Sequence, residues 1–139
     1  MRIAFILFLI FLLFSLYLLF DKYLFLSEKE KIDKIIEKAR SACEREDLNQ
    51  ISQLIAKDYY DNFGHDYYQL LKTLKNVFNL YDEIRIYLLA KKITLKDSIA
   101  ICSLRVRAIG LAKDTKEYEV FYKELITLYL KNRKIYYAE

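Results

Sequence analysis

Residues 84–137 alternate between apolar and polar side chains in a way that is typical of β-strands. Between Ile99 and Ala112 the even-numbered residues are apolar as far as Ala108, whereas Arg105 and Arg107 occupy odd-numbered positions. Successive side chains of a strand point to opposite faces of a sheet, so one face of this strand is buried and the other is not. The pattern predicts four strands joined by short turns: Ile84–Leu95, Ile99–Ala112, Tyr118–Leu130 and Ile135–Tyr137.

The turn at Asp97-Ser98 fixes how the first two strands pair. A two-residue turn places Leu95 opposite Ala100, and both side chains belong to the apolar set. The same register turns Lys91 towards the buried face, so we predict a β-bulge near Ala90-Lys91 that returns the apolar residues to the core. In the third strand two sets compete for the buried face, and both stay open: Leu125, Thr127 and Tyr129, or Ile126, Leu128 and Leu130.

Three helices are predicted before the sheet, each from a polar N-cap followed by an apolar stripe. Ser27, Asp47 and Asp66 are each followed three residues later by Glu or Gln, which is the spacing of a capping box. Between the second and third helices, Asp58–His65 is expected to be a loop, with Gly64 in a positive-φ turn. The stripes are Ile32, Ile35, Ile36, Ala39, Ala42 and Cys43, then Leu48, Ile51, Leu54 and Ile55, then Tyr67, Leu70, Leu71, Leu74, Val77, Phe78 and Tyr81.

The N-terminal segment Ile3–Phe20 is apolar apart from Ser15. Its length corresponds to a helix of about 27 Å, close to the ~30 Å hydrocarbon core of a bilayer. Asp21 and Lys22 are expected to end this helix. A cleaved signal peptide is the alternative, but no small-residue cleavage site follows, which favours an uncleaved anchor.

The predicted division is therefore residues 1–26, a transmembrane anchor or signal sequence, and residues 27–139, a folded domain. Lysines after the apolar segment favour a cytoplasmic domain. The very short N-terminal tail is typical of signal sequences, whose following domain is exported, and we expect a single-pass protein with an exported domain.

The charges of the chain are mild and interspersed. Its 139 residues carry a formal net charge of +4 without a block of one sign, so nothing predicts nucleic-acid binding. One His and two Cys offer no metal-ligand spacing, and no glycine-rich phosphate loop is present, so we predict no metal and no cofactor. Cys43 and Cys102 fall on core-facing positions and are expected to be buried free thiols, with a disulfide as the alternative.

Five stretches carry a packing pattern that is known from one superfamily: Ile35–Arg40, Asp58–Asp61, Leu70–Leu74, Leu104–Arg107 and Ile126–Leu130. Through them, residues 27–139 resemble the nuclear transport factor 2-like (SnoaL-like, cystatin-like cone) proteins, above all small bacterial members with one N-terminal hydrophobic segment. The resemblance implies an α+β fold in which three helices pack on a curved antiparallel sheet around a conical pocket. The superfamily contains isomerases, dehydratases and hydrolases as well as binding and assembly domains, so it does not select a function.

The acid–base candidates of the chain cluster in the tyrosine-rich segment and comprise Asp58, Asp61, His65 and Asp66. An isomerase or dehydratase of this fold would need a carboxylate or imidazole in the pocket and a tyrosine for a developing oxyanion. The catalytic candidates are accordingly Asp58 or His65 with Tyr59 or Tyr60. A structural function of the cluster is favoured, because the inward strand positions carry no acid or base beyond Cys102. The predicted pocket-lining residues are Tyr59, Tyr60, Tyr67, Cys102, Leu104 and Val106.

The favoured hypothesis is a membrane-anchored, non-catalytic domain that binds a small apolar ligand or a protein partner. A cone-fold lyase or isomerase is the alternative, and a scaffold subunit of a membrane complex is a second one. The outer sheet face carries Ile99, Ile101 and Ile109 beside Arg105 and Arg107, which is more apolar than an exposed face should be. We therefore expect a homodimer through this face, with the membrane surface as the alternative cover.

Overall fold

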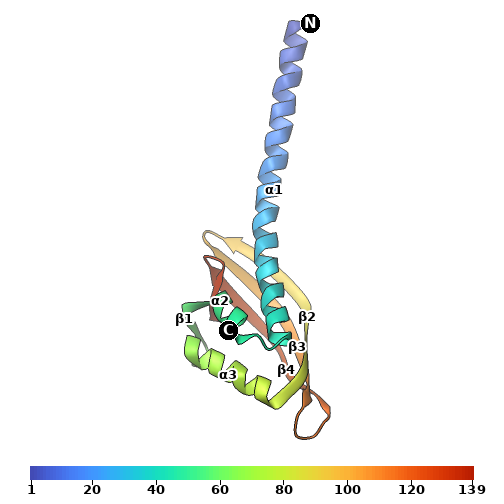
Figure 1. Cartoon of the computed structure of the whole chain (residues 1–139). Helices are drawn as coiled ribbons and strands as arrows, with labels where there is room; N and C mark the ends of the chain where they lie inside the picture. Colours follow the sequence, from blue (N-terminus) through green and yellow to red (C-terminus); the bar gives the residue numbers. More distant parts are fainter. The chain divides into compact units, whose positions relative to one another are not determined.

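The computed structural model describes residues 1, 3–23 and 28–139, and the chain forms two compact units, Met1–Lys31 and Ile32–Glu139. The helices are α1 (Arg2–Glu44), α2 (Leu48–Leu54) and α3 (Tyr67–Leu80). The strands are β1 (Ile55–Asp61), β2 (Tyr81–Lys96), β3 (Ile99–Ala112), β4 (Tyr118–Lys131) and β5 (Lys134–Ala138), as labelled in Figure 1.

In the first unit, the large apolar side chains of α1 between Ile3 and Phe20 are exposed. Within the part of the chain that the structure describes, α1 is the one helix long and apolar enough to cross a membrane, a property shared with signal sequences and buried helices. The expected helix end at Asp21 and Lys22 is wrong, because α1 continues through both residues. Charged residues end an apolar run without breaking a helix. The capping box expected at Ser27 lies outside the described residues.

The second unit contains one five-stranded sheet in the order β1-β5-β4-β3-β2. Strands β2 to β5 pair antiparallel in sequence order, which confirms the predicted meander. The register of β2 on β3 shifts between Leu88 and Ala90, so the predicted bulge is present. Because the bulge adds one residue to β2, Ile84 and Ile86 pack on the core instead of facing away from it.

Strand β1 replaces the end of the predicted second helix and part of the predicted loop. Helix α2 ends at Leu54, and Ile55 begins a strand that pairs in parallel with β5, opposite Ile135. An isoleucine four residues after Ile51 fits a helical stripe as well as a strand, so local spacing did not separate the two. The sheet is antiparallel in its other pairs and parallel in this one.

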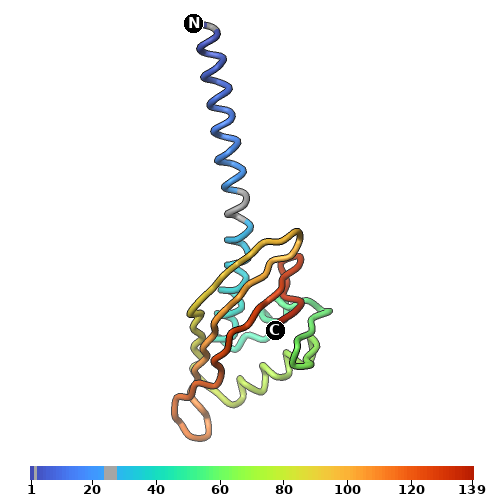
Figure 2. The backbone as a smooth tube through the Cα atoms, turned by 180° about the vertical axis from the view of Figure 1, so that it is seen from behind, coloured from blue at the N-terminus to red at the C-terminus, as the bar shows by residue number. Residues whose placement is uncertain are grey.

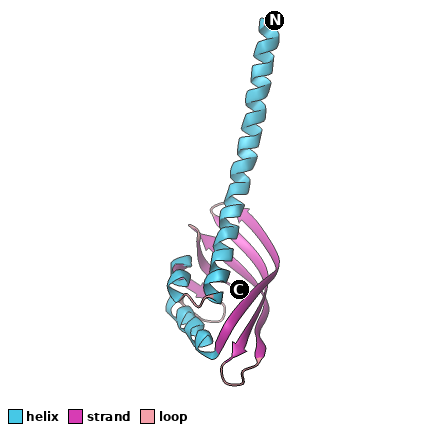
Figure 3. Ribbon diagram, turned by 45° about the vertical axis from the view of Figure 1, so that its right-hand side comes forward, coloured by secondary structure: helices cyan, strands magenta, loops and turns pink.

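The helices cover the concave side of the sheet, as Figure 3 shows for α2 and α3. The inward row of β3 is buried from Ala100 to Ala108, as predicted. In β4, Ile126 and Leu130 pair with Leu104 and Ala100, which settles the open choice in favour of the set that contains them. The core joins these strands to Ile32, Ile36 and Ala42 of α1, Ile51 of α2, and Tyr67 and Phe78 of α3.

The part of α1 that belongs to the second unit runs along β2, the edge strand of the sheet. Lys91 forms ion pairs with Asp33 and with Glu37, the latter at 3.2 Å. Two helical turns after Glu37, the Glu44 carboxylate accepts a hydrogen bond of 2.9 Å from the backbone amide of Ile86. Helix and strand therefore run in opposite directions, and the chain enters this unit at the Lys91 end of β2.

The C-terminus lies beside the segment that follows β1 (Figure 2). The Asn62 amide donates to the Ala138 carbonyl at 3.3 Å, and Glu139 exchanges two backbone hydrogen bonds with Thr127 of β4. Strand β5 ends at this point. Within residues 28–139, no strand pairs with the outer side of β4 between residues 118 and 126, which leaves an open sheet edge.

Candidate functional site

The segment between β1 and α3 folds around the carboxylate of Asp61, whose side chain is only 4% exposed. Its Oδ1 accepts the backbone amides of Phe63 at 3.0 Å and of His65 at 2.9 Å. Its Oδ2 accepts the Tyr59 hydroxyl at 3.0 Å and lies 3.1 Å from Nδ1 of His65. Gly64 completes the turn with a φ of 88°, as predicted.

These contacts keep Asp61 ionised. Burial alone would raise the pKa of Asp61, but hydrogen bonds from the His65 amide, the Tyr59 hydroxyl and the His65 ring together lower it below its ordinary value. Burial raises the pKa of Tyr59, and the neighbouring carboxylate raises it further, so the phenol stays protonated and donates. The loop is thus organised by one buried negative charge.

The Asp61–His65 pair has the geometry with which a carboxylate orients an imidazole. When Nδ1 donates to Asp61, Nε2 of His65 is left to exchange a proton with a ligand. The His65 side chain is 35% exposed, so it is accessible to solvent. Asp61 is poorly suited to act as a base itself, because a protonated carboxyl would lose the hydrogen bonds that hold the loop. Of the predicted catalytic candidates, the structure brings His65 and Tyr59 together through Asp61.

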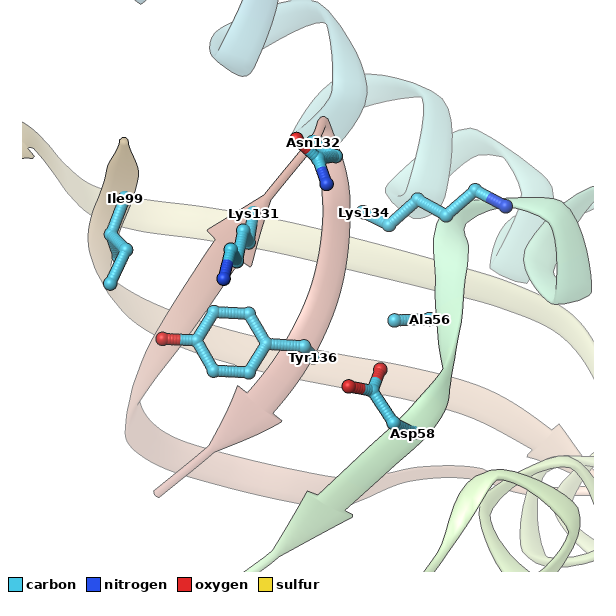
Figure 4. A pocket seen from close by; sticks show the side chains of 7 residues that line it. All are labelled: Ala56, Asp58, Ile99, Lys131, Asn132, Lys134 and Tyr136. Atoms are coloured by element: carbon cyan, nitrogen blue, oxygen red, sulfur yellow. The ribbon is translucent and has the colours of Figure 1, made fainter. Parts of the chain in front are cut away.

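Asp58 and Tyr60 lie on the other side of β1, because neighbouring residues of a strand alternate. The Tyr60 side chain is exposed, and its ring lies 4.8 Å from the ring of Tyr137 on β5. Asp58 lines a pocket of about 380 Å³, where Figure 4 shows it and Lys131 on either side of the Tyr136 ring. We call this the lysine pocket, and its lining comprises Ala56, Asp58, Ile99, Lys131, Asn132, Lys134 and Tyr136.

The other residues predicted to line a pocket lie in the packed core. The Tyr67 hydroxyl accepts a hydrogen bond of 3.0 Å from Nζ of Lys57, which lowers the pKa of Tyr67. Burial raises the pKa of Cys102 to about 11, and this thiol and Cys43 are both free. Tyr67, Cys102, Leu104 and Val106 all belong to the buried cluster between the sheet and the helices.

A second pocket of about 380 Å³ opens at the free edge of β4 beside Phe63. The sequence alone does not indicate this pocket, because its lining joins the loop after β1 to a strand far along the chain. An apolar ring in an otherwise polar turn was the available signal, since Phe63 stands between asparagine and glycine. We call this the Phe63 pocket, and its lining comprises Phe63, Phe121, Tyr122, Lys123, Glu124, Leu125, Ile126 and Glu139.

Comparison with known proteins identifies the fold. No family model matches the sequence, and no curated protein matches it. Bd1075 of Bdellovibrio bacteriovorus superposes with a TM-score of 0.67 at 16% identity, over 81% of this chain and 40% of that one. A nuclear transport factor 2-like superfamily protein of Salmonella enterica gives 0.69 at 13% identity, over 80% and 87%. The domain has the nuclear transport factor 2-like fold. A putative scytalone dehydratase of Novosphingobium aromaticivorans, a further example of similar structure, gives 0.70 at 16% identity, over 82% and 83%.

The nuclear transport factor 2-like fold confirms the α+β architecture that the sequence predicted, with its curved sheet and three helices. Likeness at such low identity defines the fold and not an activity. The chain spans about two fifths of the length of the Bdellovibrio protein. The fold does not specify a function, so the candidate sites are the residues around Asp61 (Tyr59, Phe63 and His65) and the two pockets.

Proposed function

We propose that this protein is a membrane-anchored, non-catalytic domain of the nuclear transport factor 2-like fold that binds a small apolar ligand. The observation that carries the proposal is the state of Asp61. Its carboxylate is buried and engaged by four donors from its own loop and strand, so it supports structure rather than proton transfer. The inward row of β3 from Ala100 to Ala108, which β5 and β4 separate from β1, is wholly apolar.

The Phe63 pocket is the binding site in this proposal. Aromatic and aliphatic side chains such as Phe63, Phe121 and Ile126 supply its apolar surface, and Lys123 and Glu139 supply charges beside it. Its volume of about 380 Å³ lies within the range of pockets that hold small molecules. An open sheet edge gives a ligand direct access without a moving lid.

Native mass spectrometry of the full-length protein, extracted from its membrane into neutral detergent, tests this site. The expected result is a bound small molecule that is lost from Phe63→Ala and retained by Tyr68→Ala. Tyr68 is a matched control, because it is an aromatic residue of similar exposure on α3 that does not line the pocket. Equal loss from both variants, or no bound molecule in the wild type, contradicts the proposal.

A lyase or isomerase is the second candidate function, and the 3.1 Å contact between Nδ1 of His65 and Asp61 favours it. The putative scytalone dehydratase shares the fold. In this reading, His65 exchanges the proton, Asp61 orients the ring and Tyr59 holds the carboxylate. Turnover of β-hydroxy carbonyl compounds that His65→Gln abolishes would support it. A wild-type protein without turnover on such a panel would dismiss it.

The anchor itself belongs to this proposal. One exposed apolar helix supports a single-pass protein, and an exported domain is part of the same proposal. The intact mass of the membrane-extracted protein should include residues 1–26. Protease added to intact spheroplasts should digest the domain. Protection of the domain would instead indicate that it faces the cytoplasm.

We also propose a homodimer through the outer sheet face. Tyr87, Leu89 and Val120 are large apolar residues that are 47–58% exposed on β2 and β4. Large apolar residues that gather on one exposed face are unusual for a monomer, and a second copy packed on this face would cover them. Light scattering on the full chain in neutral detergent should give a dimer that Tyr87→Asp dissociates and Tyr68→Asp does not. A monomeric wild type would refute the dimer.

A further inference from the structure

We propose that the lysine pocket binds the phosphate group of anionic lipid headgroups, at the end of the domain where the chain arrives from the apolar segment. The inference rests on the proposed membrane anchoring. Its starting point is a row of directly opposed residues across the sheet, Lys96, Ile99, Lys131 and Lys134. Opposed residues of a sheet share a face, so the row brings three lysines to the outer face, with Lys131 directly beside Lys134 and with Ile99 between Lys131 and Lys96.

The turn between β4 and β5 holds two of these lysines in register. Asn132 and Arg133 are its two central residues, with φ values of 52° and 61°. Positive φ at both central positions defines the type I′ turn that joins tightly paired strands. Glycine is favoured where φ is positive, and an arginine there adds a third basic residue to the turn at some conformational cost.

These basic residues are not neutralised within the domain. Among residues 28–139, no ion pair involves Lys96, Lys131, Arg133 or Lys134, whereas Lys91 is held by two carboxylates. Asp33 and Glu37 of α1 are paired with Lys91, and the acidic residues beside the lysine row include Asp58, across the pocket, and Asp97, in the β2–β3 turn. The basic side chains outnumber them, so the region attracts anions.

The shape of the lysine pocket suits a headgroup. Its volume is about 380 Å³, and Asn132 and Tyr136 add polar groups to the lysines that line it. Figure 4 shows Lys131 and Tyr136 close together, with Ile99 at the margin. Lysine binds phosphate as a compact point charge, and each lysine close to an anionic membrane surface strengthens binding by about fivefold.

The position of the pocket selects a lipid as the source of the phosphate. Asp33 lies at Lys91 and Glu44 at Ile86, so moving back along α1 towards its start leads along β2 towards Lys96. The chain therefore enters the domain at the end that carries the lysine row. The residues before that entry belong to α1, the one described helix that is apolar enough to cross a bilayer.

The test uses the full chain in neutral-detergent micelles and native mass spectrometry with three probes: phosphatidylglycerol, phosphatidylcholine and inorganic phosphate. The expected result is retention of phosphatidylglycerol at least tenfold above phosphatidylcholine, with no competition from millimolar phosphate. The triple variant Lys96→Gln, Lys131→Gln, Lys134→Gln should lose this preference. The matched control is the triple variant Lys72→Gln, Lys75→Gln, Lys116→Gln, which removes the same charge from α3 and the β3–β4 turn and should keep it.

Three results would overturn the inference. Equal loss in the control variant would mean that net charge alone attracts the lipid. Equal retention of phosphatidylcholine, whose headgroup has the phosphate but no net charge, would exclude recognition of the anionic headgroup by its charge. Competition by inorganic phosphate at the lipid's own affinity would identify a site for a soluble anion instead. Failure of the anchor is distinguished by the intact mass: a chain cleaved near residue 27 that still prefers phosphatidylglycerol would refute the anchor and leave the lysine site standing.

Discussion

Removal of the Asp61 carboxylate is the sharpest test of how the domain is held together. In Asp61→Ala, four donors lose their acceptor: two backbone amides, the Tyr59 hydroxyl and the His65 ring. A buried donor without a partner costs about 1–3 kcal/mol. The amides and the imidazole lie in an exposed loop and can turn to water, whereas the Tyr59 residue is only 5% exposed. The stranded Tyr59 hydroxyl therefore carries most of the penalty, and we expect a loss of about 1–3 kcal/mol in the free energy of unfolding.

Asp61→Asn separates the hydrogen bonds from the charge. The asparagine carbonyl can still accept the amides of Phe63 and His65, and its NH2 group can donate to the Tyr59 oxygen and to a neutral imidazole. The expected loss is about 1–2 kcal/mol. Asp58→Asn is the matched control on the exposed side of the same strand and should change the free energy of unfolding by less than about 0.5 kcal/mol.

The pH dependence follows from the lowered pKa of Asp61. A carboxylate whose pKa is lower in the folded than in the unfolded chain contributes stability above its unfolded pKa, and this contribution disappears as the pH falls through the folded pKa. The difference between the wild type and Asp61→Asn should therefore be constant from about pH 5 to pH 7 and shrink below about pH 4.

Urea unfolding of the full chain in neutral detergent, followed by near-ultraviolet circular dichroism of its tyrosines, measures these differences. A difference between wild type and Asp61→Asn that stays constant down to pH 3, or one no larger than that of Asp58→Asn, would refute the assigned function of Asp61.

Three further variants test the packing of the domain by the same urea titration. Gly110→Ala should cost about 1–3 kcal/mol, because an added Cβ would lie 2.8 Å from Cβ of Tyr81 and 3.1 Å from the Phe121 ring; unchanged stability would contradict this close approach. Cys102→Ala should cost roughly 1–3 kcal/mol through lost packing, and an effect seen only under oxidising conditions would instead reveal a disulfide with Cys43. Asp66→Ala should cost about 1 kcal/mol by removing the cap of α3, and Asp66→Asn should recover most of it; an equal loss in both would contradict the capping.

The residues that local rules govern were predictable from the sequence. The alternation of apolar residues along β3 predicted that Ala100 and Cys102 lie on the buried face. The capping box predicted that α3 begins at Asp66, where both hydrogen bonds of the box are present. The bulge in β2 was predictable because the apolar pattern changes phase near Ala90. In each case the deciding information lies within a few residues along the chain.

Features that depend on distant partners were not predictable. Strand β1 forms by pairing with β5, where Ile55 lies opposite Ile135, and the sequence near Ile55 does not indicate this distant partner. The face of β4 was settled by its pairing with β3. Asp61 was one of several acids in a short segment, and only the fold shows that it shares a side of β1 with Tyr59. The turn chemistry of an aspartate that accepts amides two and four residues later was the signal available.

The extra residue in the middle of β2, Leu89, sets the phase of the strand on its two sides. Before it the even-numbered Ile84 and Ile86 pack on the core, and after it the odd-numbered Ile93 and Lys91 face the helices. Deletion of Leu89 would reverse the side-chain directions in one half of β2 relative to the other, so the residues of that half would have to turn to the opposite face of the sheet. Either the aliphatic residues would turn outward or Lys91 would leave its carboxylates. Deleting or inserting a residue at this bulge should therefore destabilise the domain more than a substitution does, although bulges are local irregularities of a sheet.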